Sequence, residues 1–183
     1  MKIQFYGQNC FTISGKEASC AFDTPENFSQ SVDVTMDSGN FSAKNIESKK
    51  NLSLPGEFEI SGILVKGFYS DDQQKNIVYK IIIDDVCCVH LGDLQEIPHT
   101  KFFENLGENV DIAFVNFSES LNEKKVKDLL EKIEPRMVLL GGDESFFPKM
   151  VETCGAKTSE ENPITVSKSS LSNDKTDIFI MNV

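Results

Sequence analysis

Val34-Thr35-Met36-Asp37-Ser38-Gly39-Asn40-Phe41 is the stretch on which the interpretation of this chain depends. The alternation in Val32-Asp33-Val34-Thr35 predicts a β-strand that leads into it. Turn-forming residues follow, so the predicted strand ends in a polar loop. The stretch contains no histidine, and the whole chain has only two, His90 and His99.

Short runs of alternating or apolar residues extend outward from this stretch through the first half of the chain. Asp84-Asp85 and Ser14-Gly15-Lys16-Glu17 have the composition of tight turns between such runs. The predicted strands cover residues 2–7, 10–15, 32–35, 57–60, 63–66, 77–83 and 86–90, with a further segment at 21–25.

Helical spacing appears in the second half of the chain. Residues 98–106 predict a short helix with a proline near its first turn. Residues 118–133 predict a longer amphipathic helix, capped by Ser118 or Ser120 and ended by Pro135. The remaining predicted elements are a buried strand at 137–140, a short helix at 144–154, and two weak strands at 164–166 and 177–181 within the polar segment 155–183.

The composition is that of one folded domain that spans residues 1–183. Hydrophobic residues make up 39% of the chain and charged residues 26%, which is ordinary for a globular protein. This length supports one sizeable core and leaves little room for a second. The order of strands and helices by itself indicates an α/β or α+β class.

Charge and cysteine content limit the expected partners and location. The net charge is −11 and Lys/Arg pairs occur only as Lys49-Lys50 and Lys124-Lys125, so nucleic acid is not an expected partner. The apolar run at 86–89 is too short to cross a membrane, and Met1 leads directly into a strand without a signal sequence. Five cysteines without paired spacings predict reduced thiols and a cytoplasmic protein.

The segments around the opening stretch resemble the metallo-β-lactamase superfamily. The similarity is to its small branch of L-ascorbate-6-phosphate lactonase-like and zinc-dependent hydrolase proteins, and it extends over about residues 1–145. This resemblance implies a four-layer αββα sandwich. The segments that carry it are Lys2–Gly7, Cys10–Gly15, Ala21–Pro25, Pro55–Gly62, His90-Leu91-Gly92-Asp93 and Val110–Val115.

The resemblance also indicates where the metal ligands of the family would fall. Of these positions only Asp93, which would bridge the two metals, keeps a family ligand. Zinc needs three or four nitrogen, sulfur or oxygen ligands that converge on it, and two histidines in the whole chain cannot form the usual set. The complete set of vestigial ligand positions is Met36, Ser38, Asn40, Phe41, Asp71, Asp93 and Gly142.

We therefore expect a catalytically inactive, zinc-free protein of this fold that acts as a binding or structural module. No cofactor is expected, and the partner is an unidentified protein or small molecule. Neither a membrane nor a nucleic acid fits the composition. Homo-oligomers are plausible, because open sheet edges in such folds can pair.

Two alternatives remain open at this point. The first is a metal-dependent hydrolase with an oxygen-ligand site around Asp93, since carboxylates converging in one cleft attract hard cations such as Mg²⁺ or Mn²⁺. The second is a metal-free enzyme that uses a cysteine or His90, although His90 is expected as a buried neutral imidazole. The candidate hard-cation cluster consists of Asp37, Asp71, Asp72, Asp93 and Asp143.

Overall fold

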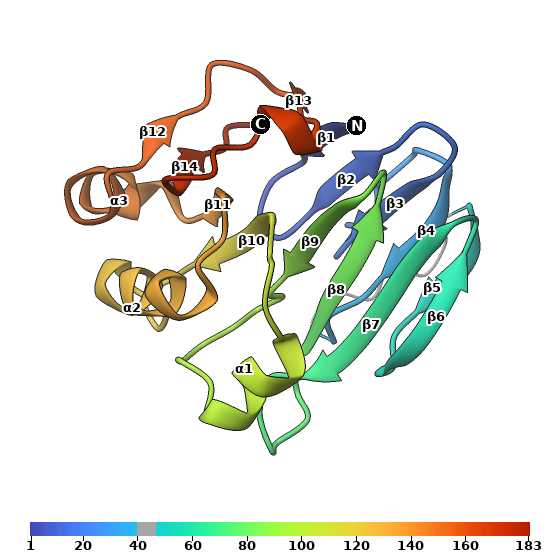
Figure 1. Cartoon of the computed structure of the whole chain (residues 1–183), viewed down its shortest axis with the longest axis horizontal. Coiled ribbons are helices and arrows are strands. Elements are labelled where there is room, and N and C mark those ends of the chain that lie inside the picture. Colours follow the sequence, from blue (N-terminus) through green and yellow to red (C-terminus); the bar gives the residue numbers. More distant parts are fainter. Residues whose placement is uncertain (40–46) are drawn as a thin grey trace.

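The computed structural model describes residues 1–39 and 47–183 and contains two β-sheets that face each other (Figure 1). Sheet one has six strands, in the spatial order β13 (Ile164–Thr165), β1 (Lys2–Phe5), β2 (Phe11–Ser14), β3 (Ser19–Phe22), β4 (Val32–Met36) and β5 (Ser48–Leu52). Sheet two has eight, in the order β12 (Lys157–Thr158), β14 (Asp177–Ile180), β11 (Met137–Gly142), β10 (Ile112–Phe117), β9 (Val86–His90), β8 (Ile77–Ile83), β7 (Ile63–Tyr69) and β6 (Gly56–Ile60).

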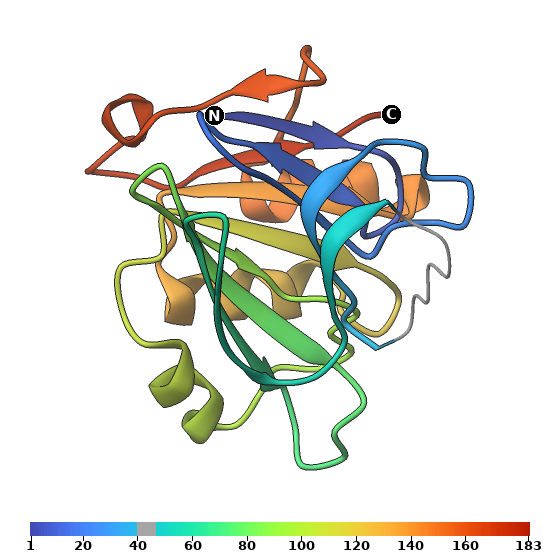
Figure 2. The ribbon, with the colours of Figure 1, turned by 90° about the vertical axis from the view of Figure 1, so that its right-hand side faces the viewer.

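Both sheets are mixed. In sheet two β6 to β9 pair antiparallel, whereas β9, β10, β11 and β14 run parallel. The strands before and after the longer helix, β10 and β11, are direct neighbours in this parallel part. Figure 2 looks onto the side of the molecule where β5 and β6, the last strands of the two sheets, lie.

Two hydrophobic clusters hold the layers together. The first lies between the sheets, where Phe11 of sheet one meets Phe114 of sheet two with ring centroids 4.8 Å apart. The second lies between sheet two and the helices, where Val115 and Leu129 are buried. The central parallel strands of sheet two are apolar on both faces for this reason. The helices are α1 (Thr100–Leu106), α2 (Glu123–Ile133) and α3 (Phe147–Cys154), with 3₁₀ turns η1 (Glu144–Phe146) and η2 (Lys168–Ser170).

The predicted metallo-β-lactamase-type architecture is confirmed, with the helices of residues 1–39 and 47–183 on one side of the two sheets. All three α-helices of the described residues pack on the outer face of sheet two, so the outer helical layer expected over sheet one is not found there. A row of residues across sheet one lines its outer face. Gln4, Thr12, Ala21, Thr35 and Asn51 are neighbours across successive strands and alternate with core residues, so they point away from sheet two. Thr12, Ala21 and Thr35 are nevertheless buried, so the middle of this face is not open to solvent.

Local predictions hold where turn and capping chemistry is explicit. Asp84 and Asp85 both have positive φ, 50° and 65°, as expected for a tight hairpin turn. Helix α2, however, begins later than predicted, because Asn122 caps it by accepting from the Lys125 amide at 3.2 Å. Ser118 instead accepts from the Leu121 amide in a separate turn. No helix in the described ranges is long and apolar enough to span a membrane.

The polar C-terminal segment contributes β13 to sheet one, beside β1, and two strands to sheet two, β14 beside β11 and β12 beside β14. A buried carboxylate fastens it. Asp111 accepts from the Cys87 amide at 2.8 Å, from Arg136 at 3.1 Å and from Lys168 of the segment. Arg136 also donates to the Leu171 carbonyl at 2.6 Å. Burial raises the pKa of Asp111, but these donors outweigh it and hold the pKa below its usual value.

Replacing Asp111 by Ala should lower the free energy of unfolding by about 1.5–3 kcal/mol, because a charged acceptor is removed from three donors. Urea denaturation measures the loss. The matched control is Lys175→Ala, which removes the exposed ion pair with Asp177 and should cost less than about 1 kcal/mol. Equal, small losses in both variants would contradict the role given to Asp111.

Candidate functional site

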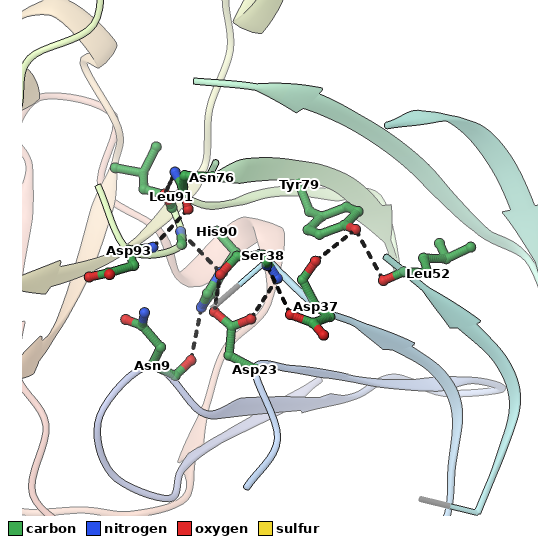
Figure 3. A network of polar contacts seen from close by, with 12 residues as sticks. Asn9, Asp23, Asp37, Ser38, Leu52, Asn76, Tyr79, His90, Leu91 and Asp93 are labelled. Atoms are coloured by element: carbon green, nitrogen blue, oxygen red, sulfur yellow. Dashed lines mark hydrogen bonds and ion pairs between the residues drawn. The ribbon is translucent and has the colours of Figure 1, made fainter. Parts of the chain in front are cut away.

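The candidate site is a hydrogen-bonded network at the ends of β3, β4 and β9, where the family would hold its metals (Figure 3). Asp23 follows β3 and Ser38 lies two residues beyond β4. Both are buried, with exposed fractions of 3% and 0%. Ser38 donates its amide to Asp23 Oδ1 at 2.7 Å and its hydroxyl to Asp23 Oδ2 at 2.9 Å. These two bonds close the crossover from β3 to β4.

His90, at the end of β9, lies against the same carboxylate. Its Nε2 is 2.9 Å from the Asn9 carbonyl and its Nδ1 accepts the Gly92 amide at 3.2 Å. A carbonyl can only accept, so Nε2 carries the proton and the ring is neutral. Phe22 stacks on the imidazole at 4.5 Å with an interplanar angle of 2°. The expectation of a buried neutral imidazole at His90 is confirmed.

Burial moves the pKa values of the two groups in opposite directions. It lowers the pKa of His90 to about 4, despite the bond to Asn9 that favours the charged ring. It raises the pKa of Asp23 to about 7, against the two Ser38 donors and with small additions from the charges of Asp37 and Asp93. His90 Nδ1 lies 3.8 Å from Asp23 Oδ2, beyond hydrogen-bonding distance.

Asn76 fills the other side of the network. Its side chain donates to the Leu91 carbonyl at 2.9 Å and accepts the Asp93 amide at 2.9 Å. The backbone between Leu91 and Asp93 passes close to Asn76 and Ser38. A Cβ on Gly92 would lie 2.2 Å from Asn76 Oδ1 and 2.7 Å from Ser38 Cβ. Gly92 has φ +66°, so glycine is required for its conformation as well as for space. Ser38 and Asn76 thus enclose the loop that carries Asp93.

Tyr79 of β8 links the network to sheet one. Its hydroxyl lies 3.1 Å from the carbonyls of both Asp37 and Leu52, so one proton is shared between the two acceptors. Burial raises the pKa of Tyr79 well above its ordinary value, and the phenol stays neutral. The Ile77 amide donates to the Ser38 carbonyl at 2.8 Å. The segment after β4 is therefore held by β8 as well as by Asp23.

The vestigial ligand positions do not form a zinc site among the described residues. Met36 is part of the core between the sheets. Gly142 has no room for a side chain, since a Cβ there would lie 2.3 Å from the Phe117 carbonyl oxygen. Asp71 caps its own turn by accepting the amides of Gln73 and Gln74 at 2.7 and 3.0 Å. Asn40 and Phe41 lie outside the described residues.

The aspartates of the proposed hard-cation cluster also make local bonds. Asp37 accepts the Gly39 amide at 2.9 Å, and Asp143 accepts the Ser145 amide at 2.9 Å. Asp93 accepts the side-chain amide of Gln95 at 2.7 Å. The fifth member, Asp72, is exposed. In the ranges 1–39 and 47–183, no three His, Cys, Asp or Glu side chains are grouped as a metal ion would require.

The sequence indicated the family's metal-ligand positions but did not predict the hydrogen-bonded network around Asp23. Asp23, Asn9 and Asn76 were not among the predicted site residues, and Ser38 was seen only as a lost ligand. One feature of the sequence could have indicated the network, namely the position of Asp23 directly after an apolar strand. A buried carboxylate at such a place needs donors, and the structure supplies them from Ser38. All five cysteines are free, and four are buried, as expected for reduced thiols.

Comparison with solved structures gives the same fold. A Thermotoga maritima protein proposed to be a Zn-dependent hydrolase of the metallo-β-lactamase superfamily superimposes with a TM-score of 0.84 at 17% identity, covering 99% of each chain. The metallo-β-lactamase fold protein YhfI from Bacillus subtilis has a TM-score of 0.65 at 8% identity, covering 99% of this chain and 96% of its own. Igni18, a metallo hydrolase from Ignicoccus hospitalis, has a TM-score of 0.59 at 12% identity, covering 88% and 95%.

At these identities the likeness concerns the fold alone, and no curated protein matches the sequence. The sequence model of the β-lactamase superfamily domain, by contrast, matches residues 2–140, which is most of the chain. This match includes β1 to β10, the ends of β3, β4 and β9, and the Asp23–Ser38–His90 network. The chain therefore belongs to the β-lactamase superfamily.

Proposed function

We propose that this protein is a zinc-free, non-hydrolytic member of its superfamily in which a hydrogen-bonded network replaces the metal centre. It acts as a binding or structural module for a protein or small-molecule partner. The observation that carries the proposal is Ser38. This residue stands at one of the vestigial ligand positions that the resemblance indicates, yet it is fully buried and gives both of its donors to Asp23.

The chemistry of the ligand positions supports this proposal. A metal at the family site needs side chains that converge with free lone pairs. The Ser38 hydroxyl is directed at Asp23, the Met36 side chain is in the core, and Gly142 provides no ligand. Residues 40–46, Asn-Phe-Ser-Ala-Lys-Asn-Ile, contain none of the four residue types His, Cys, Asp and Glu. We therefore derive no reaction step through a metal ion.

The network also has a physical task, namely joining the loops at the strand ends. Asp23 and Ser38 connect β3 to β4, while His90 connects β9 to Asn9 between β1 and β2. Asn76 connects β8 to the loop after β9. Side-chain hydrogen bonds thus hold loops from both sheets. The free thiols favour a reducing compartment, and we propose the cytoplasm.

Chelation should leave the stability of this protein unchanged. A bound metal stabilises a fold by mass action, so its removal would lower the melting temperature. We expect the same melting temperature with and without EDTA, and substoichiometric zinc by elemental analysis of protein purified without added metal. Stoichiometric zinc together with an EDTA-induced drop of several degrees would disprove the zinc-free proposal.

Asp23 and His90 should contribute opposite pH dependences to the free energy of unfolding, and each contribution should become visible when the other residue is replaced. Raising the folded pKa of Asp23 from 3.8 to about 7 means that stability is lost as pH rises through this window. Lowering the folded pKa of His90 from 6.5 to about 4 means that stability is lost as pH falls through that window. Near pH 5.5 Asp23 and His90 together bind one proton in the folded state and one in the unfolded state. Their contributions to the pH dependence of stability therefore cancel in the wild-type protein.

Relative to wild type, Asp23→Asn should therefore lose stability as the pH is lowered from about 6.5 to about 4. His90→Gln should lose it as the pH is raised from about 4 to about 7. Each slope can reach about 1.4 kcal/mol per pH unit, the value for one proton. Urea denaturation over this range measures both. Curves that run parallel to wild type in both variants would show that the pair does not titrate as described.

A hydrolase with an oxygen-ligand site is the second candidate function. The observation in its favour is that Asp71 and Asp93 line one cavity of about 250 Å³, which Glu96 also lines. Lys75 at the same cavity opposes a cation. On this alternative Mn²⁺ or Mg²⁺ would bind there.

Mn²⁺ should not raise the melting temperature of the wild-type protein beyond the shift seen in Asp93→Asn. Wild-type and variant melts with and without Mn²⁺ test this directly. A Mn²⁺-dependent rise in wild type that vanishes in Asp93→Asn would favour the hydrolase over the zinc-free module. The matched control is Asp128→Asn, an exposed carboxylate on α2, which should respond to Mn²⁺ as wild type does.

A further inference from the structure

The cavity of about 250 Å³ lies between the turn that joins β7 to β8 and the segment that joins β9 to α1. Asn76 and Asp93, which Figure 3 shows in the hydrogen-bonded network, both line it. Three further lining residues are buried, namely Ser70, Leu94 and Pro98. Drug-sized ligands usually occupy about 300–1,000 Å³, so this volume suits a small metabolite.

The hydroxyl of Ser70 makes no hydrogen bond within the described part of the chain. The residue is only 6% exposed, and its amide donates to the Asn76 carbonyl at 3.0 Å. A hydroxyl offers one donor and two acceptor sites, and its burial is costly while these have no partner. Because Ser70 lines the cavity, a molecule bound there can supply the partner.

Charged side chains of both signs line the same cavity. Asp71, Lys75 and Glu96 are among them, and no ion pair joins any of the three to another residue in the ranges 1–39 and 47–183. Asp71 uses Oδ1 for two amides of its own turn, which leaves Oδ2 able to accept from a ligand. Lys75 and Glu96 are exposed, so both can meet a molecule that enters from solvent.

This mixture of charges favours a ligand that carries an ammonium and a carboxylate together. A metal ion is repelled by Lys75, and a simple amine leaves that lysine without a partner. A phosphate ester or another anion is repelled by Asp71 and Glu96. Leu94 and Pro98 add apolar contact for a hydrocarbon side chain.

We propose that this cavity binds a free α-amino acid with an aliphatic side chain. Lys75 pairs with the ligand carboxylate, while Asp71 and Glu96 accept from its ammonium in charge-assisted hydrogen bonds. The Ser70 hydroxyl accepts from the same ammonium. This inference rests on the proposed function, because it names the chemical class of the module's small-molecule partner.

Isothermal titration calorimetry of the full chain with L-leucine tests the proposal. We expect one L-leucine to bind per chain. Two analogues, 3-methylbutylamine without the carboxylate and 4-methylpentanoate without the ammonium, should each bind about tenfold more weakly, because each loses a charge-assisted contact. A lack of saturable L-leucine binding at millimolar concentration, or equal binding of all three compounds, would overturn the proposal.

Two charge variants locate the two ends of the ligand. Lys75→Gln should weaken L-leucine binding about tenfold without weakening 3-methylbutylamine, which has no carboxylate to lose a partner. Glu96→Gln should weaken L-leucine and the amine but not 4-methylpentanoate. The matched control Lys124→Gln, at an exposed position of α2, should bind L-leucine as wild type does. Unchanged L-leucine affinity in both charge variants would place the ligand elsewhere and contradict the proposal.

Ser70→Ala tests the hydroxyl separately. It should weaken L-leucine binding several-fold and leave the free energy of unfolding without ligand unchanged, because the hydroxyl has no protein partner to lose. A large loss of stability in urea would contradict its assignment to the ligand. Absent L-leucine binding with melts unaffected by EDTA and Mn²⁺ would overturn this inference alone. A Mn²⁺-dependent rise in wild type that vanishes in Asp93→Asn would overturn the proposed function as well.

Discussion

The arrangement of the strand ends depends on the buried carboxylate of Asp23, which accepts both the amide and the hydroxyl of Ser38. A carboxylate this far from water is costly unless donors or a cation compensate it. Here two donors from one residue compensate it in part, and burial still raises the pKa of Asp23 to about 7. The carboxyl group is therefore partly protonated near neutral pH, which reduces the need for a positive partner.

His90 shows the complementary solution. Its ring lies in an aromatic environment, stacked on Phe22 and 6.1 Å from the Phe114 centroid, which favours the uncharged form. A neutral imidazole with fixed hydrogen bonds suits a structural joint, because it can be buried between two sheets without a counter-ion.

The sequence was most informative where chemistry is local. The hairpin turn at Asp84-Asp85, the apolar strand before His90 and the neutral state of that histidine could all be predicted, since each depends on a few neighbouring residues. Family resemblance predicted the facing sheets, and the structure confirms them. Among the described residues no α-helix lies over sheet one, and no local sequence pattern indicated this departure from what the resemblance implied. The Asp23–Ser38 pair joins residues fifteen positions apart through a crossover, and no periodicity in the sequence records such a contact.

The most direct test of the account is anomalous diffraction at the zinc absorption edge, from crystals of protein expressed with zinc in the medium. The account predicts no anomalous peak among Ser38, Asp93 and Gly142, with the Ser38 hydroxyl still within hydrogen-bonding distance of Asp23. A strong peak at that place, with Ser38 turned away from Asp23, would show that the network yields to a metal and would contradict the central claim.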